Sequence, residues 1–547
     1  MFRYLSRLTI LVIATVVPFC LADEGEHHHH GSGERLGTVH FPISCGKVAQ
    51  VDFERALAMM HSFWYEESDK AFASMANRYP QCAMAEWGVA MSAWHQLWTP
   101  PMGQDLERGV AAAKQAEALA KRASPRERDY VAAIAAYYRD YEKTSPKARA
   151  QAYSQAMEQV YKKHSADREA GLFYALSLIA ITDPNDKTFA RQRIAGPILK
   201  KVFAEQPQHP GVAHYLIHNY DYAGLADEGL DAARRYAAIA PAVPHALHMP
   251  SHIFIRVGMW QDAIDSNRAA EKAAIDYAAR AHMDGAWDQQ LHAMDYLAYA
   301  YLQSGQHRAA ENVLQDLRKI DKVVPPGLTA EYALAAVGAR YGVERRDWKA
   351  AAALPVRRSH SAGVDGMVWL SRALGAAQTG DYELASKEIA ELEELRKQLA
   401  DAGDKYWSGQ VEIQRIEAEG WLAQAQGREE DAARLLRQAT DLEDRTDKIN
   451  VTPGVIVPAR ELLADFLMET KQPALALAEY EKSLETAPRR FHGLYGAARA
   501  ALATGDSAQA RKYFAALLEA APNADGELAQ IVEAKQYVSQ QAAAVAP

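Results

Sequence analysis

The chain has 547 residues, too many for a single packed core, and this length allows roughly three or four domains or one elongated array. Hydrophobic residues make up 49% of the sequence and charged residues 24%, which excludes a disordered or collagen-like chain and predicts a folded, mostly soluble protein. The net charge is −9, from 61 lysines and arginines against 70 aspartates and glutamates, so no nucleic-acid partner is expected.

The first residues have the pattern of a secretory signal peptide, which we predict at 1–22. Two arginines precede an apolar run from Leu8 to Phe19, which is too short to span a bilayer as a helix. We therefore expect an exported protein, periplasmic or secreted, with no membrane span after cleavage. A flexible tail that includes four histidines, followed by a lead-in segment, is predicted at 23–50, and no part in the fold is assigned to the tail.

Two cysteines, Cys45 and Cys82, remain after removal of the signal segment. In an oxidising compartment such a pair predicts a disulfide, which would contribute roughly 3 to 4 kcal/mol by constraining the unfolded chain. The alternative is a pair of thiolate ligands to a metal, which their spacing supports poorly.

From about residue 51 onward, helix-forming residues recur at helical spacing, with Gly or Pro at short intervals and no alternating strand pattern. This indicates paired antiparallel helices. Near the C-terminus, small, aromatic and proline positions repeat with a period of 34 residues: Lys471, Ala476, Tyr480 and Pro488 are followed by Gly505, Ala510, Phe514 and Pro522.

This period and pattern resemble the tetratricopeptide repeat (TPR), in which a glycine turns helix A into helix B and an aromatic residue packs against the next unit. The same spacing recurs at Gly224, Gly229, Ala233 and Pro241, at Phe63, Ser68, Phe72 and Pro80 without the turn glycine, and in part from Gly258, Gly305, Gly380 and Gly427. The uneven distances between turns indicate either insertions or an unrecognised degenerate unit around Asp347 and Trp348. We predict an all-α, TPR-like α-solenoid of roughly eight to ten antiparallel helix pairs.

The predicted regions are N-terminal helical repeats at 51–205, central repeats with a histidine-rich groove at 206–322, degenerate helical repeats at 323–449, and C-terminal TPR repeats at 450–547. Five longer runs resemble those of a group of exported bacterial TPR proteins: Phe53 to Pro80, Cys82 to Gly88, His214 to His218, His245 to His252, and His292 to Tyr296. The resemblance implies the fold and export, and leaves the chemistry to the residues themselves.

Eight of the 19 histidines lie between His209 and His292, more than twice the number that an even distribution would place there. Counted from the turn glycines, six of them and one aspartate fall on one face of helix A in three successive repeats: His214, His218, His245, His248, His252, His292 and Asp295. In the TPR family this face lines the concave groove. His282 is out of phase and His209 precedes its helix, so both are excluded from the set.

Histidines four residues apart on a helix can chelate Zn, Cu or Ni, and Asp295 is suited to complete the shell or to orient a ring. We predict a transition-metal site at these seven residues, with Zn or Cu as the expected ion. No phosphate-binding loop or dinucleotide fingerprint is found, so no nucleotide cofactor is expected. The alternatives are a metal-free polar ligand pocket and structural hydrogen bonding.

Further residues on the same face are predicted to contact a ligand: Asp221, Tyr222, Arg256, Tyr299 and Gln303. His61 and His95 lie in aromatic clusters near the N-terminus, which either pack helices together or reach the central site if that end of the solenoid curls over the groove. Pro250 either kinks a helix where His248 and His252 converge, or marks a helix that begins only at Ser251 and leaves His245 and His248 on a loop.

The predicted function is the binding of a protein, peptide or small-molecule ligand in a concave groove with a metal-binding floor. A metal-dependent enzyme is the first alternative, with Asp295, Tyr299 or Arg256 handling protons or charge, and a metal-free protein scaffold is the second. The sequence contains no HExxH helix and no GxSxG elbow. Four side-chain ligands would indicate a structural site, and three would indicate catalysis.

Overall fold

The computed structural model describes residues 34–97 and 100–545, with side chains up to residue 540. The predicted signal peptide and the flexible tail with its four histidines lie outside these residues. The chain divides into a short unit, Met1–Glu34, and a second unit, Arg35–Pro547, to which all of the following description applies.

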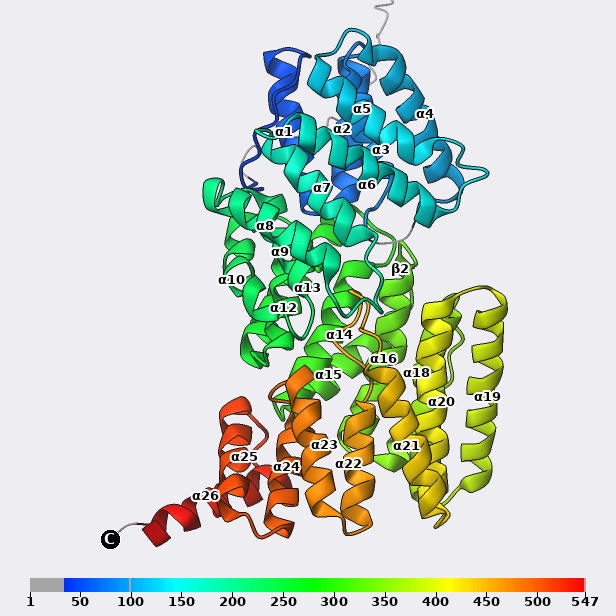
Figure 1. The fold of residues 1–547 in the computed structure, drawn as a ribbon, viewed down its shortest axis with the longest axis vertical. Helices are drawn as coiled ribbons and strands as arrows, with labels where there is room; N and C mark the ends of the chain where they lie inside the picture. The colour runs from blue at the N-terminus through cyan, green and yellow to red at the C-terminus, as the bar shows by residue number, and fades with distance from the viewer. Residues whose placement is uncertain (1–33, 98–99, 546–547) are drawn as a thin grey trace, which may run out of the picture. The chain divides into compact units, whose positions relative to one another are not determined.

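Nearly all regular structure in the described residues is helical (Figure 1). The helices of the first half are α1 (Lys47–His61), α2 (Tyr65–Arg78), α3 (Ala83–Ala93), α4 (Gly103–Ala120), α5 (Pro125–Tyr138), α6 (Pro146–Lys163), α7 (Arg168–Ala180), α8 (Ala190–Glu205), α9 (Pro210–Tyr220), η1 (Ala226–Gly229), α10 (Leu230–Ile239), α11 (Pro244–His248), α12 (Pro250–Arg256) and α13 (Trp260–Arg280). Those of the second half are α14 (Asp288–Gln303), α15 (His307–Arg318), α16 (Leu328–Glu344), α17 (Trp348–Ala352), α18 (Ala362–Thr379), α19 (Tyr382–Asp401), α20 (Lys405–Ala425), α21 (Glu429–Glu443), α22 (Ala459–Glu469), α23 (Pro473–Thr486), α24 (Phe491–Ala503), α25 (Ser507–Ala520) and α26 (Ala529–Val545). Two short strands, β1 (Ala286–Trp287) and β2 (Val323–Val324), pair in parallel.

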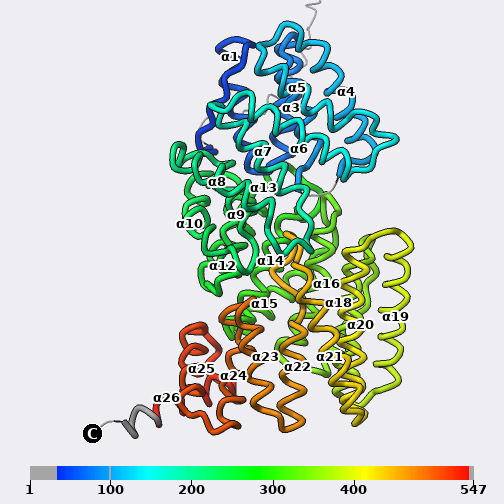
Figure 2. The backbone as a smooth tube through the Cα atoms, in the orientation of Figure 1, coloured from blue at the N-terminus to red at the C-terminus, as the bar shows by residue number. Residues whose placement is uncertain are grey.

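Helices that follow one another in the sequence pack side by side along the unit (Figures 1 and 2). This confirms the all-α, TPR-like solenoid. The described helices outnumber the predicted eight to ten pairs, because α4 to α8 follow one another without the glycine and aromatic pattern that marks the other repeats.

The turns between helices A and B explain the repeat pattern seen in the sequence. Gly505, between α24 and α25, has a φ of 83°, in the left-handed region that glycine adopts without strain. Lys471 and Arg346 adopt the same conformation at equivalent turns, with φ of 59° and 55°. Since Arg346 joins α16 to α17, the degenerate unit around Asp347 and Trp348 is present, and the turn without a glycine concealed it.

The chain also folds back on itself at two places. Helix α1 packs against α9, and α24 packs against α14. Beside the second contact, just before α24, the carbonyl oxygen of Arg489 accepts from the indole of Trp260 on α13 at 3.0 Å, and Arg490 donates to the hydroxyl of Tyr299 on α14 at 3.2 Å. The N-terminal end of the solenoid therefore does reach the central repeats, and so do the C-terminal repeats.

The loop between α21 and α22, residues 444–458, crosses the central repeats and is seen in light orange beside α14 and α16 (Figure 2). Arg340 of α16 donates to Thr452 at 3.0 Å and to the carbonyl of Gly454 at 2.5 Å. Lys448 donates to Asp221 at 2.8 Å. We call this segment the 444–458 loop.

The predicted disulfide between Cys45 and Cys82 is present and joins the segment before α1 to the start of α3. Beside it, Phe41 packs among Phe53, Trp87 and Tyr130 at ring-centroid distances of 5.0 to 5.9 Å. Among the described residues, no helix has both the length and the apolar character needed to cross a membrane.

Candidate metal centre

Six predicted histidines come together from four helices in the core of the central repeats. His214 and His218 lie on α9, His245 and His248 on α11, His252 on α12 and His292 on α14. Each is between 0% and 4% exposed. The spacing of i and i+4 puts His214 and His218 on one face of α9, as the sequence predicted.

His248 and His252 lie on either side of a break in the helix at Pro250. Helix α11 ends at His248 and α12 begins at Pro250, and Met249 between them keeps helical dihedral angles, φ −52° and ψ −37°. Pro250 supplies no amide hydrogen, and the hydroxyl of Ser266 on α13 donates to the carbonyl of Leu247. The helix is thus divided at Met249, beside Pro250, and the alternative in which His245 and His248 lie on a loop is wrong.

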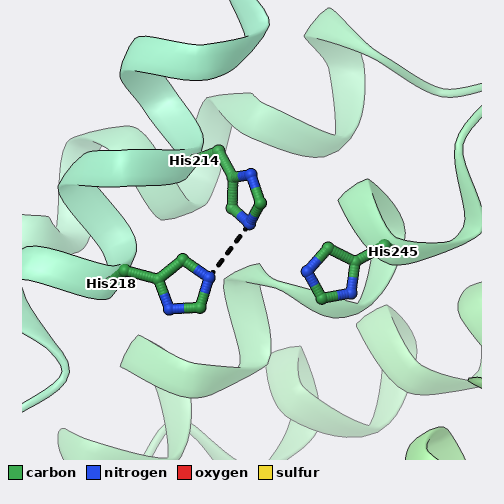
Figure 3. A group of neighbouring side chains, drawn as sticks. All are labelled: His214, His218 and His245. Atoms are coloured by element: carbon green, nitrogen blue, oxygen red, sulfur yellow. Dashed lines mark hydrogen bonds between the residues drawn. The ribbon is translucent and has the colours of Figure 1, made fainter. Parts of the chain in front are cut away.

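The first cluster, which we call triad one, consists of His214, His218 and His245, whose nearest ring nitrogens all lie within 4.8 Å of one another (Figure 3). The Nδ1 of His214 is 2.7 Å from the carbonyl oxygen of His61. A carbonyl only accepts, so Nδ1 carries the hydrogen and Nε2 of the neutral ring presents a lone pair. That lone pair faces Nε2 of His218 at 3.1 Å.

Triad two consists of His248, His252 and His292, again with ring nitrogens within 4.8 Å. Nδ1 of His248 donates to Oδ1 of Asn267 at 2.6 Å, while the amide nitrogen of Asn267 is engaged with the carbonyl of Ala263. Nδ1 of His252 donates to Oδ2 of Asp221 at 3.0 Å. With both Nδ1 atoms serving as donors, the two Nε2 atoms face each other at 3.0 Å as lone pairs.

The two triads are neighbours. The ring centroids of His218 and His252 are 5.9 Å apart, and those of His245 and His248 are 6.0 Å apart. Tyr296 lies beside triad two, with its ring 4.6 Å from that of His248 and its hydroxyl 3.3 and 3.4 Å from the two nitrogens of His252. The six imidazoles therefore form one continuous cluster.

A third cluster was missed by the sequence analysis and consists of His61, Glu169 and His209. Nε2 of His61 and Nε2 of His209 donate to the two oxygens of Glu169 at 3.0 and 2.8 Å. Nδ1 of His61 lies 2.7 Å from the hydroxyl of Tyr215, and Nδ1 of His209 accepts from the amide of Val212 at 3.4 Å. Every ring nitrogen here has a complementary partner, so no ion is needed to complete the cluster.

Phe63 brings the loop between α1 and α2 into triad one. It occupies the turn where the repeat pattern lacks its glycine, and its φ of 53° is uncommon for a bulky side chain. Its ring centroid is 4.3 Å from that of His214, 5.6 Å from His218 and 6.0 Å from His245. Phe63 therefore keeps a backbone conformation that is usual for glycine, and its ring packs against all three imidazoles of triad one.

The electrostatics of the site favour neutral rings. Burial lowers the pKa of all six histidines, and the neighbouring imidazoles lower it further for all of them except His252. Although burial opposes ionisation of Asp221, the charges of Lys448 and Arg256 hold the pKa of that carboxyl well below its usual value. Asp221 is thus an ionised acceptor behind His252, in the arrangement that orients histidine ligands to metals.

A cavity of about 410 Å³ adjoins both triads. His218, His245, His252 and His292 contribute to its lining, and so do Tyr222 and His95 from the predicted ligand-binding set. Asp221 and Arg256 lie behind His252, where Arg256 donates to Asp221 at 2.8 Å. His61 contributes its carbonyl oxygen to His214, while its ring belongs to the third cluster.

Three predicted residues lie elsewhere. The carboxylate of Asp295 accepts from Arg340 and is not among the grouped ligand atoms of the described residues. Tyr299 accepts from Arg490, and the side-chain oxygen of Gln303 accepts from the amide of Phe491. Asp295 was predicted as a ligand from its phase on helix A, but it instead balances the charge of a buried arginine, and the other two residues join α14 to α24.

Other residues at the site carried no usable sequence pattern. Lys448 comes from the 444–458 loop, 156 residues after His292, and Glu169 comes from α7. His209 precedes its helix, as the sequence predicted, and caps the N-terminus of α9. Glu66, five residues after His61, also lines the cavity.

No protein-family model matches the sequence, and no curated protein matches it. Among solved structures, a tetratricopeptide repeat protein from Parabacteroides merdae is 13% identical and covers 54% of this chain and 97% of its own, with a TM-score of 0.27. Human IFIT1 is 12% identical over 86% of this chain and 90% of its own, with a TM-score of 0.36. Yeast Tom70 is 11% identical over 91% and 97%, with a TM-score of 0.34. Likeness at this level says nothing of function.

Proposed function

We propose that this protein binds transition-metal ions, Zn or Cu, at triad one and triad two. The observation that carries the proposal is the contact between Nε2 of His248 and Nε2 of His252 at 3.0 Å, while Asn267 and Asp221 hold the hydrogens of both rings on Nδ1. Two lone pairs at this distance repel each other unless a cation lies close to both.

A proton is the other cation that would relieve this repulsion. It would create a buried imidazolium, which burial disfavours. At His252 the carboxylate of Asp221 offsets part of this effect and the positive charges of Lys448 and Arg256 add to it, so that the pKa of His252 is still lowered. A metal ion instead uses neutral imidazoles, the form that the site favours. Imidazole ligands suit Zn and Cu, and the carboxylate behind His252 is typical of zinc-binding histidines.

The third cluster is an internal comparison within the same protein. Its two histidines share Glu169 between them and present no facing lone pairs. We therefore assign it a structural role, as a link between α1, α7 and the start of α9. The proposed metal binding is limited to triad one and triad two.

Export to an oxidising compartment is part of the proposal. It is supported by the apolar N-terminal run with its preceding arginines and by the disulfide between Cys45 and Cys82.

The test is elemental analysis of protein that lacks His27 to His30 and is purified without chelator or metal-affinity resin. We expect one or two equivalents of Zn or Cu in the wild type and in a His209→Gln variant. The double variant His214→Ala/His252→Ala should contain none. A folded wild type that holds no metal, even after dialysis against Zn and then Cu, would refute the proposal.

A metal-dependent enzyme is a second candidate. It is favoured by the number of protein ligands, three in each triad, and by the cavity that adjoins both triads. Three histidines with a fourth position open to water are typical of catalytic zinc sites. Hydrolysis of 4-nitrophenyl acetate by the metal-loaded protein should then exceed that of the His252→Ala variant, and equal rates would count against catalysis of this kind.

A further inference from the structure

We propose that the cavity binds a small molecule with two charged ends, an ammonium group held by Glu66 and Asp288 and an anionic group held by the metal ions, as in an amino carboxylate. This inference rests on the proposed function, since the metal ions supply the anion-binding end. It adds the chemical class of the ligand.

Glu66 and Asp288 form an acidic pair within the cavity wall. Glu66 lies in the first turn of α2, and Asp288 is the first residue of α14. Asp288 accepts from the hydroxyl of Thr329 at 3.0 Å and from the side-chain amide of Gln289 at 3.4 Å, but no ion pair joins either carboxyl to a basic side chain of the described residues. The positive ends of two helices favour acids at these positions without supplying a counter-ion.

The neighbouring Glu67 is a carboxylate with a structural role, and it serves as a comparison for Glu66. Glu67 accepts from Lys70 at 2.8 Å and from the hydroxyl of Tyr277 at 2.9 Å. It is not part of the cavity lining, whereas Glu66 is. The pair formed by Glu66 and Asp288 thus differs from Glu67 in lacking a cation.

Both carboxyls of the pair have raised pKa values, which a cationic ligand would lower again. Burial and the nearby Asp288 raise the pKa of Glu66 to about 7, and burial raises the pKa of Asp288 to about 6. A bound ammonium group would stabilise both carboxylates in their ionised form.

Aromatic side chains surround the acidic pair. Trp64, Tyr65 and Trp287 line the cavity, and Tyr277 packs between the two indoles at centroid distances of 5.3 and 4.5 Å. Aromatic faces attract organic cations and pack against alkyl chains. This wall therefore suits an alkyl ammonium group better than a hydrated metal ion.

The end of the cavity that would bind the anionic group lies one turn of α14 away from Asp288. Asp288 and His292 are four residues apart on α14, a spacing that places their Cβ atoms about 5 to 6 Å from each other. His218, 3% exposed, also lines the cavity, and its Nδ1 has no hydrogen-bond partner among the described residues. A short chain between the two charged groups would span this distance, and the cavity volume suits a small molecule.

The experiment compares two series of hydroxamates on the zinc-loaded full chain without His27 to His30. One series carries a terminal amine on a linear chain of three to six carbons, and the other carries the same chain without it. The hydroxamate anchors each probe on the metal, so calorimetry isolates the contribution of the amine. Zinc content is measured again after each titration.

For at least one chain length, the amine should strengthen binding about tenfold or more, as expected for a charge-assisted hydrogen bond. The variants Glu66→Gln and Asp288→Asn should lose this preference, and Asp284→Asn, which removes an exposed acid outside the cavity, should retain it.

Equal or weaker binding of the amines at every chain length, or no hydroxamate binding to zinc-loaded protein, would overturn the inference alone. A chain that takes up no metal would overturn the proposed function as well, and elemental analysis separates the two results.

Discussion

The position of the hydrogen on a neutral histidine ring determines which nitrogen can accept a hydrogen bond or bind a metal ion. In triad two, Asn267 and Asp221 each fix a hydrogen on the far side of a ring, and the near sides are left as lone pairs. In the third cluster, Glu169 takes up the hydrogens of His61 and His209 directly. Equal burial and equal residue type thus lead to opposite arrangements of ring hydrogens and lone pairs, because the neighbouring groups differ.

Phe63 offers a test at this scale, because its backbone and its side chain have opposing effects on stability. Replacement by glycine relieves the left-handed conformation, whereas replacement by alanine keeps the strain, and both remove the ring. We expect both variants to be less stable than the wild type, by about 3 to 5 kcal/mol for alanine. The glycine variant should be the more stable of the two by about 1 kcal/mol, measured by urea denaturation. The reverse order would show that Phe63 is not strained.

A second residue-scale prediction concerns pH. Burial raises the pKa of Glu443 to about 7, above its value of about 4.5 in an unfolded chain. The folded protein therefore binds more protons than the unfolded chain between these values. Its free energy of unfolding should fall as pH rises from about 4.5 to 7, by at most about 1.4 kcal/mol per pH unit from this group.

The Glu443→Gln variant provides the control for this titration. Glutamine has a similar shape and does not ionise, so the contribution of this residue to the slope should disappear, and the pKa of the buried Glu417, which Glu443 helps to raise, should fall as well. Denaturant titrations of both proteins at pH 5, 6 and 7 give the comparison. Identical slopes would show that Glu443 is not protonated in the folded state at pH 5.

At the scale of elements, the break at Pro250 aligns two helical segments so that three histidines from α11 and α12 meet one from α14. Pro250→Ala would restore an amide hydrogen and allow α11 and α12 to join into a continuous helix. His248 and His252 would then shift relative to each other, and zinc binding should weaken about tenfold or more. Competition with a chelator of known affinity measures this.

Pro244→Ala is the matched control, since Pro244 begins α11 instead of interrupting a helix. Its zinc affinity should stay within about twofold of the wild type. Equal losses in the two variants would mean that the break is not what positions the ligands.

Local pattern predicted much at this scale. The glycine turns and the phase of each histidine predicted that the six imidazoles share one face of the central helices, because both follow from packing within one repeat. The third cluster and Lys448 could not be found in this way, because their residues meet only through contacts between distant repeats. The same limit applies to Asp295, whose partner Arg340 lies on another repeat.

For the whole molecule, the contact of α24 with α14 adds to the neighbour-to-neighbour packing of a solenoid. Trp260 meets Arg489, and Tyr299 meets Arg490, across more than 190 residues of sequence. The repeat pattern of the sequence could not predict these contacts, because they join residues far apart in the chain. The central repeats are therefore held by their neighbours, by the C-terminal repeats and by the 444–458 loop.

Phe514 tests how far a local loss of packing spreads. It is fully buried between Tyr495 and Tyr537, so Phe514→Ala should cost about 3 to 5 kcal/mol. Hydrogen exchange should rise first in α25 and α26 and stay unchanged in α1 to α8. An even rise along the chain would contradict the solenoid organisation.

The 444–458 loop also has a consequence for the order of events during synthesis. All six imidazoles have been made once His292 is complete, but Lys448 is made 156 residues later. At about 5 to 20 residues per second, this leaves an interval on the order of 10 to 30 s. During that time the ligands exist on the growing chain without the segment that crosses them. The ion pair of Lys448 with Asp221, behind His252, is therefore the last part of this cluster to form.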